Sequence, residues 1–267
     1  MPVEVQPTCT IVVPCYNEGA RLHGDAFLKY LNQHPDVQFL FVNDGSKDNT
    51  LAVLEGMRAQ SDGRIQILDN QPNGGKAEAV RSGMLSALKD SRVAYIGFWD
   101  ADLATPLDAI PEFLALLNHN SRLQMVFGSR VRLLGRQVNR RAIRHYLGRI
   151  FATVVSIVLR LPIYDSQCGA KIFRATPELR QVLSQPFLSR WVFDVEILAR
   201  YIALHHGDTS YLRNSIFEAT LMRWDDVAGS KVQPGDFMKA SLDVLRIYRR
   251  YLAPHARSKA AAELSRA

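Results

Sequence analysis

The chain has 267 residues, of which 47% are hydrophobic and 22% charged, a composition typical of folded globular proteins and not of disordered or fibrous ones. This length suits one large α/β domain or two small ones. Its three cysteines, Cys9, Cys15 and Cys168, are odd in number and lack metal-ligand spacing, which argues against a disulfide framework and favours the reducing cytoplasm. The net charge of +7 suits an anionic partner: nucleic acid, anionic lipid or a phosphorylated substrate.

Neither a secretory signal nor a membrane-spanning helix is expected. Residues 1–7 are polar and lack the basic-then-apolar order of a signal peptide. The longest predominantly apolar run, Ile150 to Leu159, is about half as long as a bilayer-spanning helix. Any membrane contact is therefore expected to be peripheral, at the cytoplasmic face.

Strand-like and helix-like segments alternate through the first half of the chain. Short apolar runs rich in β-branched or aromatic residues predict strands over 10–14, 38–43, 64–69, 93–99 and 124–127. Helices are predicted between them, over 19–33, 47–59, 76–86 and 107–118. Such alternation predicts a mostly parallel sheet with helices on both faces, and ligands of such sheets bind at the carboxyl ends of the strands.

The second half is less regular. We predict helices over 140–161, 191–205 and 237–252. Extended chain is predicted over 211–224, and a frayed tail over 257–267. No repeat or low-complexity linker divides the sequence, so one continuous domain is expected.

Asp100 and Asp102 follow the fourth predicted strand as a D-x-D pair. Two carboxylates beside a turn can hold a divalent cation, Mg²⁺ or Mn²⁺, through oxygen ligands. Such a cation can stabilise a departing diphosphate. The alternative is a solvated acidic turn, but the position at the carboxyl end of a strand favours the metal site.

Three more polar segments follow the first three predicted strands in the same way. After the first, Tyr16 could stack on a base and Glu18 could bond to a ribose. After the second, Asp44 could accept hydrogen bonds from a base or ribose, with an ordinary Asp-Gly turn as the alternative. After the third, Gly75 and Lys76 open a helix whose N-terminus attracts an anion.

Taken together, the four segments resemble the family 2 glycosyltransferases, which have the GT-A fold. The matching segments are I-V-V-P-C-Y-N-E at 11–18, V-N-D-G-S-K-D-N-T at 42–50, N-G-G-K at 73–76 and D-A-D at 100–102. The resemblance implies a Rossmann-like, mostly parallel sheet flanked by helices, and metal and diphosphate contacts from the D-A-D aspartates. The implied nucleotide-sugar-binding residues are Pro14, Tyr16, Glu18, Asp44, Gly75, Lys76 and Asp100.

Further segments are similar to the dolichyl-phosphate β-glucosyltransferases within this family. They are D-A-D-L-A-T-P at 100–106, F-G-S-R at 127–130, D-S-Q-C-G-A-K at 165–171, R-W-V-F-D-V-E at 190–196 and G-S-K at 229–231. The mannosyltransferases of the group usually carry D-A-D-x-Q, from which Ala104 departs. The resemblance spans roughly residues 9–250 and implies UDP-glucose as donor and a polyprenyl phosphate as acceptor. The eukaryotic members usually carry an N-terminal membrane anchor, and this sequence departs from them there.

The resemblance also implies how the single domain, residues 1–267, is organised. A nucleotide-sugar-binding half would occupy 9–128 and an acceptor half 129–235. A C-terminal helix and tail would occupy 236–267. The sequence does not predict an oligomeric state.

Positive charge is concentrated between residues 130 and 174, where Asp165 is the one acid. The cations surround the apolar helix predicted over 140–161. A basic, apolar helix suits an anionic membrane surface, with a core helix that carries a solvated basic face as the alternative. No nucleic-acid motif accompanies the charge, so nucleic acid is not an expected partner.

A lipid phosphate acceptor sets the expected chemistry. Such a phosphate is already anionic near neutral pH, so it needs no general base. It needs cations that hold it in line with the anomeric carbon of the sugar, and one in-line attack inverts that centre. The candidate cations are Arg130, Arg140, Arg141, Arg144 and Lys231.

The remaining candidate residues lie in the two most specific segments of the resemblance. Asp194 joins the D-x-D aspartates as a candidate catalytic residue, because a hydroxyl acceptor would require a base. A structural or sugar-orienting role is preferred for it. Gln167, Arg190 and Trp191 are expected to orient the sugar or the acceptor.

Other functions fit the sequence less well. A related transferase could use GDP-mannose or a hydroxyl acceptor, and a nucleotidyltransferase would release diphosphate instead of UDP. A non-catalytic nucleotide-sugar-binding protein could lose the D-x-D aspartates freely, yet both are present. The lack of a Walker A loop, of G-x-G-x-x-G after the first strand and of a Ser-His-Asp order argues against an NTPase, a nicotinamide enzyme and a hydrolase.

Overall fold

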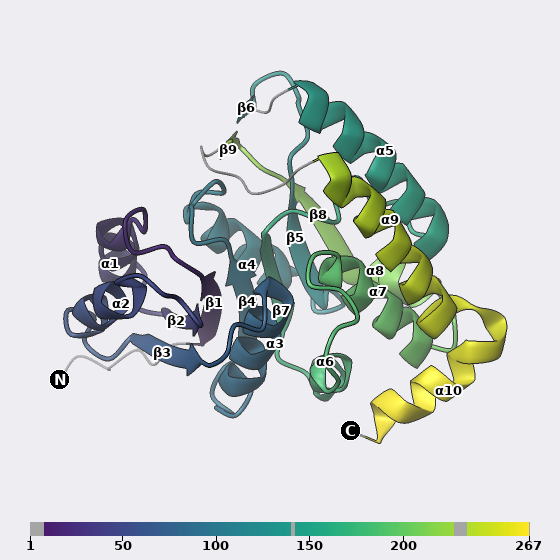
Figure 1. Cartoon of the computed structure of the whole chain (residues 1–267), viewed down its shortest axis with the longest axis horizontal. Helices are drawn as coiled ribbons and strands as arrows, with labels where there is room; N and C mark the ends of the chain where they lie inside the picture. The colour runs from purple at the N-terminus through teal and green to yellow at the C-terminus, as the bar shows by residue number, and fades with distance from the viewer. Residues whose placement is uncertain (1–7, 140–141, 227–233, 267) are drawn as a thin grey trace.

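The computed structural model describes residues 8–139, 142–226 and 234–266 (Figure 1). The strands are β1 (Cys9–Cys15), β2 (Val37–Asp44), β3 (Ile65–Asn70), β4 (Tyr95–Trp99), β5 (Met125–Ser129), β6 (Gln137–Asn139), β7 (Ala170–Arg174), β8 (Ile216–Thr220) and β9 (Arg223–Asp225). The α-helices are α1 (Gly24–Gln33), α2 (Thr50–Arg58), α3 (Lys76–Ala87), α4 (Ala109–His119), α5 (Ala142–Leu159), α6 (Pro177–Leu183), α7 (Phe193–Leu204), α8 (Ser210–Ser215), α9 (Pro234–Ile247) and α10 (Pro254–Ser265). A π-helical segment, η1 (Tyr248–Leu252), follows α9.

Seven strands form the main sheet in the order β3-β2-β1-β4-β7-β5-β8, and β6 pairs with β9 in a second, two-stranded sheet. The β3-β2-β1-β4 half is parallel throughout, and β5 is parallel to β8. Between these two groups, β7 is antiparallel to both of its neighbours. Every residue of β2 is buried, as expected for a parallel strand with helices on both of its faces.

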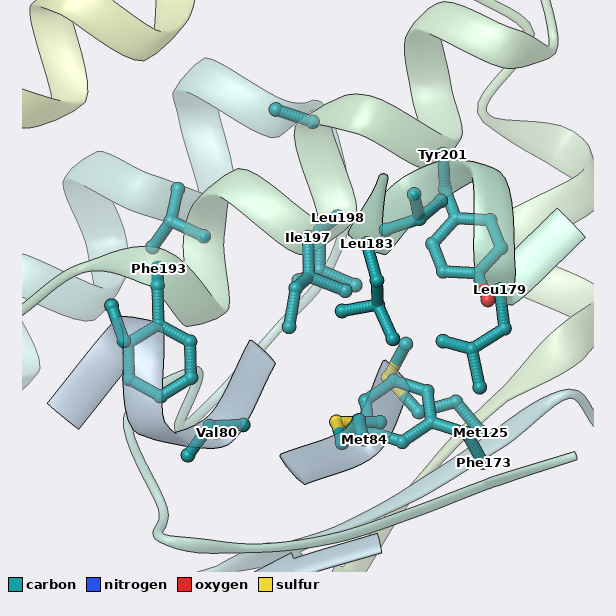
Figure 2. Packing of buried hydrophobic residues seen from close by; sticks show 14 of the residues in the cluster. Val80, Met84, Met125, Phe173, Leu179, Leu183, Phe193, Ile197, Leu198 and Tyr201 are labelled. Atoms are coloured by element: carbon teal, nitrogen blue, oxygen red, sulfur yellow. The ribbon is translucent and has the colours of Figure 1, made fainter. Parts of the chain in front are cut away.

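Helices cover both faces of the main sheet, and the sheet separates the core into two clusters, one on each face (Figure 1). On one face, α1, α2 and α4 bury residues such as Phe27, Leu54 and Phe113. On the other, α3, α5, α6, α7, α9 and α10 contribute to a larger cluster. Figure 2 shows part of this second cluster, with Ile197 of α7 on one side of it and Met84 of α3 on the other.

The strand-helix alternation predicted for the first half is confirmed, including the mostly parallel sheet. Two predictions for the second half are wrong. Residues 211–215, predicted as extended chain, belong to the short helix α8 (Ser210–Ser215), and β8 begins after it. The predicted frayed tail is largely α10, because Ala260, Ala261 and Leu264 are buried in the larger core cluster or beside it. Among the described residues, no helix is long and apolar enough to cross a membrane.

Candidate active site

The four predicted polar segments meet at one edge of the sheet. They follow the carboxyl ends of β1, β2, β3 and β4, which lie side by side and parallel. The carboxyl ends of parallel neighbouring strands point the same way, so residues distant in sequence become neighbours there. This edge is the candidate site.

The second and third segments are joined by the Asp44 carboxylate. It accepts hydrogen bonds from the backbone N–H groups of Gly74 and Gly75, both at 2.8 Å, and from Asn73 Nδ2 at 2.9 Å. Gly45 has φ of 64°, and a Cβ there would lie 2.7 Å from the backbone nitrogen of Asn73. Asp44 is therefore buried under the loop that it shapes, and contact with a base or ribose stays a prediction.

The first segment is fastened to the start of α2. The backbone N–H of Glu18 donates to Thr50 Oγ1 at 2.8 Å, and that of Asn17 donates to Ser46 Oγ at 3.0 Å. The Glu18 carboxylate forms an ion pair with Arg21. Tyr16, in the same segment, has 37% of its surface exposed, so its ring can be reached by a base.

The D-A-D segment is fixed by contacts with α3 and with the approach to β7. Asp100 donates its backbone N–H to Gly169 O at 2.9 Å, and its carboxylate forms an ion pair with Lys76. Gly169 is required here, because a Cβ at this position would lie 1.8 Å from Asp100 Oδ2. Asp102 Oδ1 accepts a hydrogen bond from the backbone N–H of Ala104 at 3.1 Å.

Negative charge at this edge is only partly neutralised. Burial, and then the nearby Asp100 carboxylate, raise the pKa of Asp102 above its usual range. Desolvation lowers the pKa of Lys76, but the nearby carboxylates, Asp100 foremost, together outweigh it and the net shift is upward. Lys76 pairs with Asp100 in this structure, and the charge of Asp102 would be stabilised by an added cation.

The two aspartates fit a divalent metal of the Mg²⁺ type. Within the described ranges, no group of three or more His, Cys, Asp or Glu side chains could hold a metal. Mg²⁺ in phosphoryl and nucleotide sites is commonly held by one or two carboxylates, with phosphate and water oxygens as the other ligands. The pair Asp100 and Asp102 matches that donor set.

Asp194 lies beneath the site in a buried ion pair. Its Oδ1 is 2.7 Å from Lys171 Nζ, and Lys171 also donates to the carbonyl oxygens of Cys168 and Ser166 at 2.6 and 3.0 Å. Burial raises the pKa of Asp194, although Lys171 opposes that shift. The arrangement agrees with a structural or orienting role for Asp194, and its predicted role as a base is not tested by this contact.

Arg130 is similarly engaged with a carboxylate. Its Nε and Nη2 lie 2.6 and 2.7 Å from the two oxygens of Asp165, and its backbone N–H donates to the same carboxylate at 3.1 Å. This bidentate pair fixes the guanidinium group where β5 ends. Of the other predicted acceptor cations, Arg144 lies on α5, whereas Arg140, Arg141 and Lys231 lie outside the described residues.

Arg190 reaches the site from the second half of the chain. A Cβ built on Gly75 would lie 3.2 Å from Arg190 Cδ, so the arginine side chain covers the first residue before α3. Both Arg190 and its neighbour Trp191 are exposed. Lys76 and Arg190 thus place two cations at the N-terminus of α3.

The Arg190–Trp191 segment is held in place by Ser189. Ser189 Oγ accepts hydrogen bonds from the backbone N–H groups of Trp191 and Val192 at 3.1 and 3.0 Å, and donates to Asp243 Oδ2 of α9 at 2.7 Å. In the loop before β7, the buried amide nitrogen of Gln167 has no hydrogen-bond partner within the described structure. A polar ligand would satisfy this donor.

Residues 10–178 match the family model described as Glycosyl transferase family 2. The chain belongs to the family 2 glycosyltransferases. Three relatives, all named dolichyl-phosphate β-glucosyltransferase, extend the likeness over most of this transferase. The protein of Trichomonas vaginalis is 30% identical over 250 residues, which cover 89% of this chain and 70% of the relative. Those of Dictyostelium discoideum and Drosophila melanogaster are 31% and 32% identical over 258 residues, covering 91% of this chain and 74% and 75% of theirs.

Solved structures confirm the fold of the transferase. Glucosyl-3-phosphoglycerate synthase from Mycobacterium tuberculosis, in complex with Mn²⁺, UDP and phosphoglyceric acid, matches with a TM-score of 0.63 at 16% identity, covering 90% of this chain and 77% of its own. Mannosyl-3-phosphoglycerate synthase from Rubrobacter xylanophilus matches with a TM-score of 0.66 at 17% identity, covering 94% and 76%. At such identities the likeness is one of fold, and it confirms the predicted GT-A architecture.

The sequence did not reveal the residues that support the rim of the transferase site. Arg200, fully buried on α7, donates to the carbonyl oxygens of Val182, Gln185 and Pro186 at 2.6 to 2.7 Å. Its i,i+4 partner Glu196 accepts from the backbone N–H of Leu188 at 2.8 Å. The sequence signal that could have found them was a Glu and an Arg four residues apart in a largely apolar helix. The pair holds the chain that leads into Ser189.

Proposed function

We propose that this glycosyltransferase moves glucose from UDP-glucose to a polyprenyl phosphate of the dolichyl type, with inversion at the anomeric carbon. The observation that carries the proposal is the meeting of Lys76, Asp100 and Asp102 at one sheet edge, where a nucleotide diphosphate and a cation would fit together. The names of three relatives, each 30–32% identical over about nine tenths of this chain, support the sugar and the lipid acceptor.

The donor would lie across the carboxyl ends of β1 to β4. Exposed Tyr16 would stack on the uracil, and Glu18 and the loop fastened by Asp44 would surround the nucleoside. The diphosphate would face the N-terminus of α3, where backbone N–H groups and Lys76 favour an anion. The Mycobacterium tuberculosis neighbour was solved with UDP, which supports uracil as the base.

Asp102, with Asp100, would hold Mg²⁺ or Mn²⁺ at this edge. When bound, such a cation neutralises the charge that develops on the departing UDP. Burial, and then the neighbouring Asp100 carboxylate, raise the pKa of Asp102, and a bound cation would offset both effects, which supports this assignment. Lys76 would share the task by moving between Asp100 and the diphosphate oxygens.

The acceptor step needs positioning and no proton transfer. An oxygen of the lipid phosphate attacks the anomeric carbon, a new carbon–oxygen bond forms, and the bond to the diphosphate breaks with UDP as the leaving group. Arg190, exposed beside Gly75, would hold the acceptor phosphate together with the predicted cations Arg130, Arg140, Arg144 and Lys231. Gln167, with its unpartnered buried amide, and exposed Trp191 would orient the sugar. Asp194 would support the site through Lys171.

The reaction would take place at a membrane surface, because the acceptor is a lipid. We place it on the cytoplasmic side. The three cysteines are free and buried, which supports a reducing compartment.

The test is UDP release from labelled UDP-glucose with Mg²⁺ or Mn²⁺, with and without a short polyprenyl phosphate. We expect release to depend on the lipid, with the label recovered in an acid-labile lipid product. Asp102→Asn should abolish that release, whereas Asp62→Asn, the same change at an exposed residue with φ of 47°, should leave it intact. Full activity of Asp102→Asn would remove the metal assignment, and lipid-independent release would remove the acceptor.

A further inference from the structure

The turn that carries the two aspartates contains a strained residue, Leu103. Its φ of 52° lies in the left-handed region, where the Cβ of an L-residue crowds the following carbonyl oxygen. Leu103 directly follows Asp102 and is the one apolar side chain among the described non-glycine residues with positive φ. The others are all polar: Asn17, Asp62, Arg160 and His206. The surrounding structure must therefore hold Leu103 in this conformation.

The Leu103 side chain is anchored beside α1 and α2. It is partly buried against the core cluster on that face of the sheet, as are Leu22, Leu28 and Val53. These four residues and Met57 also line a cavity of about 670 Å³ between the two helices. We call this lining the α1–α2 wall. The apolar contact of Leu103 with it would be lost if the turn relaxed, so the contact can offset the backbone strain.

The backbone conformation of Leu103 also fixes the Asp102 carboxylate. The φ and ψ of Leu103 set the direction of the Ala104 N–H group, which donates to Asp102 Oδ1 at 3.1 Å. The carbonyl oxygen of Ala104 accepts the backbone N–H of Asp225 in β9 at 3.1 Å, and Leu103 donates its own N–H to Asp100 O at 3.3 Å. A change to negative φ at Leu103 would turn the Ala104 N–H away from Asp102.

We propose that Leu103 is a positioning residue for Asp102. Its anchor in the α1–α2 wall maintains the left-handed backbone conformation that holds this carboxylate in place for the divalent cation. An apolar side chain offers the cation no ligand, so Leu103 acts through the turn and not by direct contact. The proposal rests on the proposed function, which assigns the cation to Asp100 and Asp102. It adds that packing against α1 and α2 sets the affinity for the metal.

Two substitutions separate the backbone conformation from the apolar contact. Leu103→Ala and Leu103→Asn both remove the anchor, but asparagine adopts the left-handed conformation several-fold more readily. With UDP present, we expect Leu103→Ala to bind Mn²⁺ about fivefold more weakly than the parent and Leu103→Asn to stay within about twofold of it. Electron paramagnetic resonance of free Mn²⁺ measures this. The control Leu116→Ala makes the same change at a partly buried residue of the same cluster, on α4, and should bind Mn²⁺ like the parent.

Hydrogen exchange of the Ala104 amide tests the same turn without metal. Its protection should fall about fivefold in Leu103→Ala and stay near that of the parent in Leu103→Asn, because the bond to Asp102 depends on the conformation at Leu103. Equal Mn²⁺ affinity in the parent and both variants, or an equal loss in the two variants, would overturn the proposal. A parent that binds no Mn²⁺ with UDP would count against the proposed function, and the exchange of Ala104 would then decide on Leu103.

Discussion

Asp100 owes its position to a residue on the other half of the sheet. Gly169 precedes β7 directly, and its carbonyl accepts the backbone N–H of Asp100 at 2.9 Å. The Asp100 carboxylate occupies the space in which any side chain at position 169 would begin. A residue without a Cβ is therefore a condition for the D-A-D geometry.

Gly169→Ala should separate activity from folding. The added methyl would displace the Asp100 carboxylate and its ion pair with Lys76, so we expect kcat/KM to fall about a hundredfold. Gly56→Ala is the control, because a Cβ at that exposed position of α2 meets nothing within 4 Å and should slightly stabilise the helix. Steady-state kinetics and thermal melts of both variants check this, and unchanged kinetics for Gly169→Ala would contradict it.

The Arg130–Asp165 pair can be examined with a double-mutant cycle. Either Arg130→Ala or Asp165→Ala leaves a buried charge without its bidentate partner, so each should lower the free energy of unfolding by about 3 kcal/mol. The double variant should lose clearly less than the sum. Urea unfolding measures all three. An unchanged urea midpoint together with a raised KM for the lipid would instead assign Arg130 to the acceptor alone.

The sequence allowed us to predict which residues belong to the site more easily than which residues they contact. Asp100 and Asp102 could be recognised because a strand and a turn frame them locally. The engagement of Asp44 by the backbone of Gly74 and Gly75 could not, since it depends on how close two strand ends lie. The pairing of Arg130 with Asp165 was hidden for the same reason.

At the scale of elements, α10 shows where pattern reading failed. Its sequence is rich in alanine and charge and carries few large apolar residues, so it resembled a solvated tail. In the structure it packs on α7 and η1, and alanine allows the helices to approach closely. Because the buried face of α10 consists mostly of alanine, the sequence showed no apolar stripe that would have predicted its packing.

Leu264→Ala should therefore be costly. Leu264 is 2% exposed in the core beside α7, and its truncation should lower the free energy of unfolding by about 2–5 kcal/mol. Ser258→Ala, at an exposed position of the same helix, should change it little. Denaturant melts give both values. Equal melts for the two variants would show that the end of the chain does not support the core.

For the whole molecule, binding of the donor nucleotide should raise the thermal stability of the fold. A ligand that binds the folded state alone stabilises it by about 2.7 kcal/mol at a hundredfold excess over its Kd. For a chain of this size, UDP with Mn²⁺ should then raise the Tm by about 5–10 °C. GDP with Mn²⁺ at the same concentration is the control and should raise it less. An equal shift with GDP would contradict the assignment of uridine.

The overall architecture was predictable in its first half because β-α alternation is a local, repeated signal. The insertion of β7 between β4 and β5 was not, since A-K-I-F-R is a short run without a following hairpin or crossover to mark its partners. Such strand order is settled by tertiary packing.

The position of β7 also has a consequence for synthesis. The centre of the sheet cannot close until residues 170–174 have left the ribosome, because β4 lacks its second neighbour before then. A nascent chain that has reached β5 carries an open, hydrophobic strand edge of the kind that associates with other chains. We therefore expect chaperone contact during this interval, and we expect that a fragment ending near residue 130 would aggregate instead of serving as a nucleotide-binding module.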